Sequence, residues 1–281
     1  MKKGWKIFWI VCGILAGVGV VFCVIALALG VTTDRIRIRI GDGIGIVRDE
    51  SDVTYAEDIR ETYNGVEKID AYVYAGTVKI LPADVPAVTV ETDGISEELG
   101  FESGMDGTEL KITTREHLWR INNVGTIYIY IPNDLTLDDI SMKLGAGNLY
   151  IEEIHANEMS VDAGTGEAVL QNVQAQKMGL QCGVGNIAGS GCAAEELDAD
   201  VGVGSLEFTL TGPEENYDYD ISVGVGEVRC GQEDFSGLGA RKEIDNHAGR
   251  LIKIDCGAGS AVIDFDGTGH MERKEEHHNG Y

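Results

Sequence analysis

Six copies of a Gly-x-Gly tripeptide, spaced at nearly regular intervals, constrain the fold of this chain more than any other feature. The first five begin at Gly145, Gly164, Gly183, Gly202 and Gly224, at intervals of 19, 19, 19 and 22 in the sequence numbering. A sixth copy begins at Gly257, after a longer interval of 33. A period of about 20 residues is typical of stacked repeats, in which each copy forms one layer of a longer stack.

Apolar residues alternate with polar ones on both sides of each tripeptide. The residue before the first glycine is apolar in every copy: Leu144, Ala163, Cys182, Val201, Val223 and Cys256. The fourth residue after it is also apolar: Leu149, Ala168, Ile187, Leu206, Val228 and Ala261. Alternation is the period of a β-strand. Each repeat is therefore predicted to contain roughly two short strands joined by turns, with one side of each strand facing a core.

The fold class predicted from this pattern is all-β, a parallel β-solenoid (β-helix-like) with rungs of about 19 residues. Rungs stacked about 4.8 Å apart bury apolar columns that a single rung cannot bury. The repeat is assigned to residues 141–266, after an irregular β start or cap over 66–140. The glycines are expected at sharp corners, where a side chain would clash or φ is positive. These structural corner residues are Gly145, Gly147, Gly164, Gly166, Gly183, Gly185, Gly202, Gly204, Gly224, Gly226, Gly257 and Gly259.

Two other kinds of site are also rich in glycine, but the surrounding residues do not fit either of them. A phosphate-binding loop needs a following helix and a third glycine, whereas each copy here precedes another alternating segment. Calcium-binding nonapeptide repeats need regularly placed aspartates, and this chain has no such run. No cofactor and no metal site are predicted. His277 and His278 lie in a charged, flexible tail, 267–281, and make a poor metal site.

The N-terminal segment predicts a single-pass membrane anchor. Residues 7–31 carry no charge and would span about 37 Å as a helix, enough for a hydrocarbon core of about 30 Å. Lys2, Lys3 and Lys6 precede them, which favours a cytoplasmic N-terminus (1–6) and an extracytoplasmic C-terminal domain at the cell membrane. Residues 32–65 are assigned to a juxtamembrane linker. A cleaved signal peptide is the alternative, with a candidate cleavage site at 26–28.

The net charge of the chain narrows the class of possible partners. The formal net charge is −25, from 22 Lys and Arg against 47 Asp and Glu, so an acidic surface would repel nucleic acid.

Four cysteines fall in the apolar columns of the repeat, and we expect reduced thiols there. They are Cys182, Cys192, Cys230 and Cys256. The best disulfide candidate, if one forms, is Cys182 with Cys192.

Candidates for chemistry and for contact are few. Carboxylates that could serve a polysaccharide-cleaving β-helix are Asp162, Asp198, Asp200, Asp218, Asp220 and Asp255; three of them, Asp162, Asp200 and Asp255, share one column with Lys143, Gln181 and Ser222. Outward polar residues are expected in any half-exposed strand, so no catalytic residue is assigned. Tyr217 and Tyr219 are the predicted aromatic contact points. Tyr128 and Tyr130 alternate with isoleucines and are placed on an outer face, unless such tyrosines only cover the strands.

Several segments resemble the bacterial "putative adhesin" β-strand-repeat family of unknown function, which includes LiaG-like envelope proteins. They are residues 66–74, residues 76–84, residues 127–132 and the repeated Gly-x-Gly strands. The resemblance covers about 66–265. It implies a β-solenoid-like fold, a surface location and no established catalytic residues.

The functional hypothesis is a non-enzymatic, membrane-anchored extracytoplasmic β-repeat protein. It would act as an adhesin or as an interaction module of the bacterial cell envelope, with a protein or glycan partner at the cell surface. Two alternatives are a regulatory partner of a membrane stress-response system and an enzyme acting on envelope polysaccharides.

Overall fold

The computed structural model describes residues 38–39, 45–46, 54–115 and 125–267. The chain divides into two units, Met1–Asp52 and Val53–Tyr281. In the first, β1 (Ile38–Arg39) pairs antiparallel with β2 (Gly45–Ile46). The predicted anchor, 7–31, lies outside the described residues. Within the described residues there is no helix both long and apolar enough to cross a membrane.

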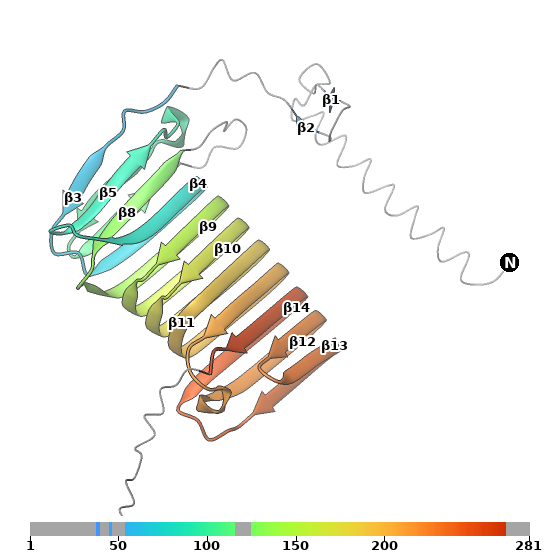
Figure 1. Ribbon diagram of the computed structural model, residues 1–281. Helices are drawn as coiled ribbons and strands as arrows, with labels where there is room; N and C mark the ends of the chain where they lie inside the picture. The colour runs from blue at the N-terminus through green and yellow to red at the C-terminus, as the bar shows by residue number, and fades with distance from the viewer. Residues whose placement is uncertain (1–37, 40–44, 47–53, 116–124, 268–281) are drawn as a thin grey trace, which may run out of the picture. The chain divides into compact units, whose positions relative to one another are not determined.

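Where the structure describes it, the second unit is all-β: its strands form one 12-stranded sheet, and two 3-10 turns, η3 (Glu97–Leu99) and η4 (Glu214–Asn216), lie between strands. Its central strands are β4 (Lys68–Ala83), β9 (Thr136–Glu152), β10 (His155–Gln171) and β11 (Gln174–Leu210). These strands pair in parallel, one behind the next, as Figure 1 shows. The predicted parallel, solenoid-like stack is therefore present.

Each rung is a continuous length of strand bent at its Gly-x-Gly, rather than the two separate short strands expected, and the long strand β11 contains two such rungs. In β9 and β10, for example, pairing runs in constant register from His155 with Thr136 to Gln171 with Glu152. Only the first glycine drops out of the register at the bend, between Ala163 and Thr165. Pairing survives because the corners of neighbouring rungs lie directly behind one another. Below, the residues of a rung before its corner are called the first half, and those after it the second half.

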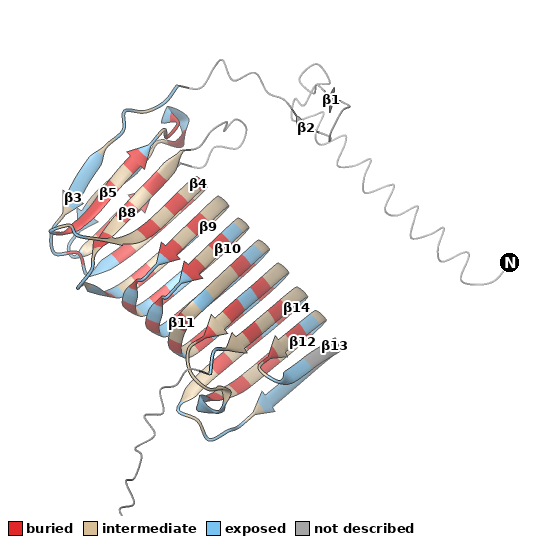
Figure 2. Cartoon of the chain, viewed as in Figure 1, coloured by how far each residue is buried: buried red, intermediate tan, exposed pale blue. Residues whose placement is uncertain are grey.

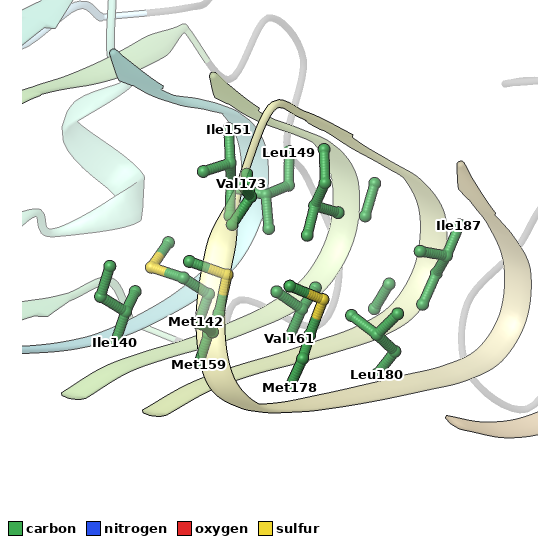
Figure 3. Close-up of a cluster of buried hydrophobic side chains, with 14 of the residues drawn as sticks. Ile140, Met142, Leu149, Ile151, Met159, Val161, Val173, Met178, Leu180 and Ile187 are labelled. Atoms are coloured by element: carbon green, nitrogen blue, oxygen red, sulfur yellow. The ribbon is translucent and has the colours of Figure 1, made fainter. Parts of the chain in front are cut away.

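The core lies between the two halves of the bent rungs. Along the strands of the rungs, residues that point inward and are buried alternate with residues that are at least partly exposed (Figure 2). Figure 3 shows Met142, Val161 and Leu180 from first halves facing Leu149 and Ile187 from second halves. A single rung could not bury these side chains, whereas the stack buries them as continuous columns.

The N-terminal end of the stack is closed by shorter strands. Strand β4 is a complete rung. On its N-terminal side, the first half of β4 pairs with β7 (Glu109–Thr113), and the second half of β4 pairs with β8 (Thr126–Pro132). Antiparallel strands then cover both: β6 (Glu102–Asp106) covers β7, and β5 (Val88–Asp93) with β3 (Arg60–Tyr63) covers β8. Because β4 is in register with β9 across its corner, a full rung already exists inside the segment 66–140.

The C-terminal end departs from sequence order. The last strand, β14 (Arg250–Phe265), pairs with the second rung of β11, and β12 (Tyr217–Cys230) pairs with the far side of β14. Strand β13 (Glu233–Ile244) then returns antiparallel to β12 and ends the sheet. The two longer intervals between the last three Gly-x-Gly copies reflect this insertion. The terminal antiparallel hairpin carries charged residues that hinder further strand addition at the edge.

Candidate functional site

The second glycine of each corner is the stricter structural requirement. A Cβ added at Gly147, Gly166 or Gly204 would lie 1.9 Å from the carbonyl oxygen of the glycine in the rung behind. At the first glycine the same distance is longer, 2.8 Å at Gly164 and 3.0 Å at Gly257. These glycines thus serve close backbone approach between rungs, a structural role that leaves no room for a bound phosphate between them.

The residue between the two glycines stands on the outside of the corner. Val184, Val203 and Val225 are 55%, 55% and 59% exposed, which is unusual for valine. The exposure of this position follows from the bend, because the side chain between two glycines points away from the core.

The predicted contact residues Tyr217 and Tyr219 are buried, so that prediction is wrong. Their side chains are 0% and 2% exposed, and their rings contact Phe265. The Tyr217 hydroxyl donates to the carbonyl of Ala194, and that of Tyr219 donates to the carbonyl of Glu214. Strand β12 lies between β14 and β13 in the sheet, so its inward-facing residues, including these two tyrosines, are part of the core. Burial raises the pKa of both phenols.

The four cysteines of the described residues are buried and free, as their apolar columns predicted. The Cys192 thiol donates to the carbonyl of Leu170, 3.8 Å away. Burial raises the pKa of each thiol, most strongly that of Cys230. The disulfide considered between Cys182 and Cys192 is not formed.

The outer side of the first halves, called here the first face, holds the six candidate carboxylates. Two of them have structural partners. Asp220 forms two hydrogen bonds with Arg241, at 3.2 and 2.9 Å. Asp218 accepts from the backbone amides of Asn246 and Ala248.

Three of the remaining carboxylates on this face share the predicted column. Asp200 and Asp255, far apart in the sequence, are paired on adjacent strands, whereas Gln181 separates Asp162 from Asp200. Asp200 and Asp255 are exposed. In the residues that the structure covers, no three acidic, histidine or cysteine side chains gather closely enough to hold a metal ion. The column is an acidic surface feature. Neither of the two cavities described below is lined by its residues.

A lysine on the adjacent column offsets part of this negative charge. Lys253 donates to Glu196 at 2.7 Å. This hydrogen bond raises the pKa of the Lys253 ammonium and lowers the pKa of the Glu196 carboxyl. Both groups are largely solvated, so the pair contributes little to stability.

The outer side of the second halves, called here the second face, has a different character. An open groove of about 510 Å³ crosses β10, β11, β14 and β12 and is lined by Val169, Ala188, Glu207 and Val262 among others. At its end Arg229 forms a two-point ion pair with Asp264, with distances of 2.6 and 3.1 Å. A second open cavity, about 590 Å³, lies in the N-terminal cap between Ala56 and Ser103.

Aromatic side chains continue the second face toward the N-terminal end of the stack. Tyr128 and Tyr130 on β8 are partly exposed, as placed from the sequence, with ring centroids 5.9 Å apart and planes 5° from parallel. The Lys79 ammonium lies 5.5 Å from the Tyr128 ring centre and 5.9 Å from that of Tyr150. The sequence did not single out Tyr150, Lys79 or the groove, because β4 and β8 become neighbours only in the folded stack.

Comparison with solved structures finds similar chains of low identity. One is a "putative cell adhesion protein" from Clostridium sporogenes, 16% identical, with 74% of this chain and 99% of that chain covered and a TM-score of 0.45. Another is a "putative adhesin" from Bacteroides fragilis, 20% identical, with 74% and 97% covered and a TM-score of 0.45. A third is a "putative adhesin" from Parabacteroides distasonis, 12% identical, with 74% and 96% covered and a TM-score of 0.35.

Comparison with curated proteins gives no match. In contrast, the sequence pattern of one family, described as Toastrack DUF4097, matches residues 66–224, which is more than half of the chain. The matched segment begins shortly before β4 and ends at the corner of β12, so it includes β9, β10 and β11 completely. The chain belongs to the Toastrack DUF4097 family.

Proposed function

We propose that this protein is a non-enzymatic interaction module of the bacterial cell envelope, acting in the manner of an adhesin. The observation that carries the proposal is the register of the stack. Outward-facing positions repeat from rung to rung with the same unbroken offset from β9 through β10 to β11. Two extended faces result, one acidic and one partly aromatic. Such long, rigid faces suit contact with an extended partner better than they suit enclosing a small substrate.

The proposal includes attachment to the membrane through residues 7–31. The uncharged length of this segment and the three lysines before it support the attachment. The C-terminal domain would then project from the outer side of the cell membrane, with a net negative surface that keeps it away from anionic lipid headgroups. Its partner would be a protein or a glycan at the cell surface.

Membrane attachment is tested by fractionation of cells that express the full chain. We expect the protein in the membrane pellet after alkaline carbonate washing, and we expect added protease to degrade it in intact cells. Removing residues 7–31 is expected to move it to the soluble fraction. A full chain that washes off the membrane, or that is protected from external protease, would contradict the proposed location.

Binding is tested by sedimentation of the full chain, held in lipid nanodiscs, with isolated cell walls and with whole cells. We expect saturable co-sedimentation and no release of soluble sugar during the incubation. Failure to sediment with either material would contradict an adhesive role. Sugar release that disappears in an Asp162→Asn/Asp200→Asn variant would instead support the polysaccharide-acting enzyme.

A further inference from the structure

Three parallel columns of side chains run along the second face, and they differ in polarity. The central column is apolar or aromatic for most of its length; in the order of the stack it contains Tyr128, Lys79, Tyr150, Val169, Ala188, Glu207, Val262 and Arg229. Its members come from successive rungs of the stack, so neighbours are about 4.8 Å apart. All are at least partly exposed.

Hydrogen-bonding residues flank the central column on both sides. On the corner side the column contains Thr77, Asn148, Glu167, Asn186, Ser205, Ser260 and Glu227. On the far side it contains Glu152, Gln171, Ser190, Thr209 and Asp264. Within the corner-side column, Ser205 donates to the Asn186 amide oxygen at 2.8 Å. The second face is thus a mainly apolar and aromatic track, interrupted by Lys79, Glu207 and Arg229, between two polar margins. This central column and its margins are called the track below.

The two ends of the track are built differently. At one end the Lys79 ammonium contacts the rings of Tyr128 and Tyr150, and the Tyr128 ring stacks on that of Tyr130. At the other end small side chains hollow the surface. Ala188, paired with Val169, adds only a methyl group, and the groove of about 510 Å³ opens above these two residues.

We propose that this track binds a linear, uncharged glycan lying along the axis of the stack. A pyranose ring is amphipathic: its C–H groups pack on aromatic and aliphatic side chains, and the hydroxyl groups at its edges need hydrogen-bond partners. An apolar column between two polar columns provides both. The track is long enough for several sugars, since five strand-to-strand steps of about 4.8 Å separate Tyr150 from Arg229, about 24 Å in all.

Charge selects against an acidic glycan. The chain has a net charge of −25, which repels a polyanion. The cation in the groove, Arg229, is already neutralised by its two-point contact with Asp264, and Glu207, two strands away in the same column, is exposed. Carboxylates and amides that accept and donate hydrogen bonds suit hydroxyl groups instead. This inference rests on the proposed role as an envelope interaction module, for which it names the ligand class and the face.

The test measures binding of cellohexaose and chitohexaose to the full chain in nanodiscs by isothermal titration calorimetry, with the disaccharides cellobiose and chitobiose for comparison. We expect at least one hexasaccharide to bind at least 10-fold more tightly than its disaccharide, because it contacts more rungs. Hexagalacturonate, a polyanion of equal length, is expected to bind at least 10-fold more weakly. If neither neutral hexasaccharide binds, or if hexagalacturonate binds best, the inference is wrong.

Two variants on the second face and one on the first locate the site. Tyr150→Ala, which removes a ring, and Ala188→Arg, which fills the groove, are each expected to weaken hexasaccharide binding about 10-fold. Asp162→Asn/Asp200→Asn, on the opposite face, is expected to leave it unchanged. Circular dichroism melting verifies that each variant is folded. A Tyr150→Phe variant, which keeps the ring, is expected to retain binding. If Tyr150→Ala proves unstable, Ala188→Arg alone tests the second face.

The outcomes separate this inference from the function on which it rests. If the second-face variants still sediment with cell walls as the parent does, the module binds elsewhere and the glycan track is refuted. If capture by cell walls is abolished by prior protease treatment of the walls and resists competition by the hexasaccharides, the partner is a protein. If the parent itself binds no envelope material, the proposed function fails as well.

Discussion

Replacing Gly166 with alanine is expected to lower the free energy of unfolding by roughly 2–6 kcal/mol, the sum of two costs. Gly166 has φ of +145°, a conformation that is nearly restricted to glycine, and its added Cβ would lie 1.9 Å from the carbonyl oxygen of Gly147. Backbone strain of this kind costs about 1–3 kcal/mol, and overpacking adds about 1–3 kcal/mol. The oxygen belongs to the backbone of the preceding rung, so it cannot move without disturbing the hydrogen bonds between the rungs. Urea denaturation of the full chain measures the change.

The corner itself supplies matched controls. Gly164→Ala places its Cβ 2.8 Å from the carbonyl oxygen of Gly145 and should cost less than Gly166→Ala. Thr165→Ala, between the two glycines and exposed, should stay within about 0.5 kcal/mol of the parent. Equal losses at Gly164 and Gly166, or a tolerated Gly166→Ala, would contradict the assignment of the second glycine as the point of closest approach.

Alkaline pH is expected to destabilise the fold through its buried thiols. Burial, aided by the negative charges of Glu214 and Asp264, raises the pKa of Cys230 well above its ordinary value. Above about pH 8.5 the unfolded thiol loses its proton whereas the folded thiol keeps it, so the folded state binds more protons and stability falls as pH rises. The loss for one such thiol is about 1.4 kcal/mol per pH unit. Burial of Cys192 acts in the same direction.

The Cys230→Ala variant isolates this contribution. At pH 7 the variant should be less stable than the parent, because a buried side chain is shortened. Between about pH 8.5 and pH 10 the difference should narrow by about 2 kcal/mol, since only the parent has the thiol to titrate. Urea denaturation at several pH values gives both curves. Parallel curves across this range would show that the Cys230 thiol is accessible to solvent in the folded protein.

The repeat could be predicted from the sequence because apolar and polar residues alternate in the same way around each Gly-x-Gly. Alternation around each Gly-x-Gly identified the strands, and the shared columns placed Cys182, Val201 and Val223 in the core, where they are buried. The regular interval between the first copies in the sequence became the pairing offset of β9, β10 and β11. Repetition makes such inference possible, because equivalent residues of successive copies occupy the same position relative to the core.

What the sequence could not provide was the order of strands at the ends of the stack. The position of β14 between β11 and β12 depends on which edge the chain returns to, and no local pattern encodes that choice. Tyr217 and Tyr219 were assigned to the surface because they lie in the longer interval before Gly224, but they alternate in phase with Ile221 and face the core. The second-face groove was hidden for a similar reason, because Arg229 and Asp264 meet only through the pairing of β12 with β14.

The most direct test of the stack is disulfide formation between engineered cysteines, in a chain with Cys12→Ser and Cys23→Ser. Asp200 and Asp255 are paired on adjacent strands, and Ser222 lies one strand further on. Adjacent strands are about 4.8 Å apart, whereas a disulfide cannot join Cα atoms more than about 7 Å apart. We predict that Asp200→Cys/Asp255→Cys forms a disulfide under mild oxidation and that Asp200→Cys/Ser222→Cys does not. The reverse result would show that the rungs stack in sequence order and would contradict the fold described.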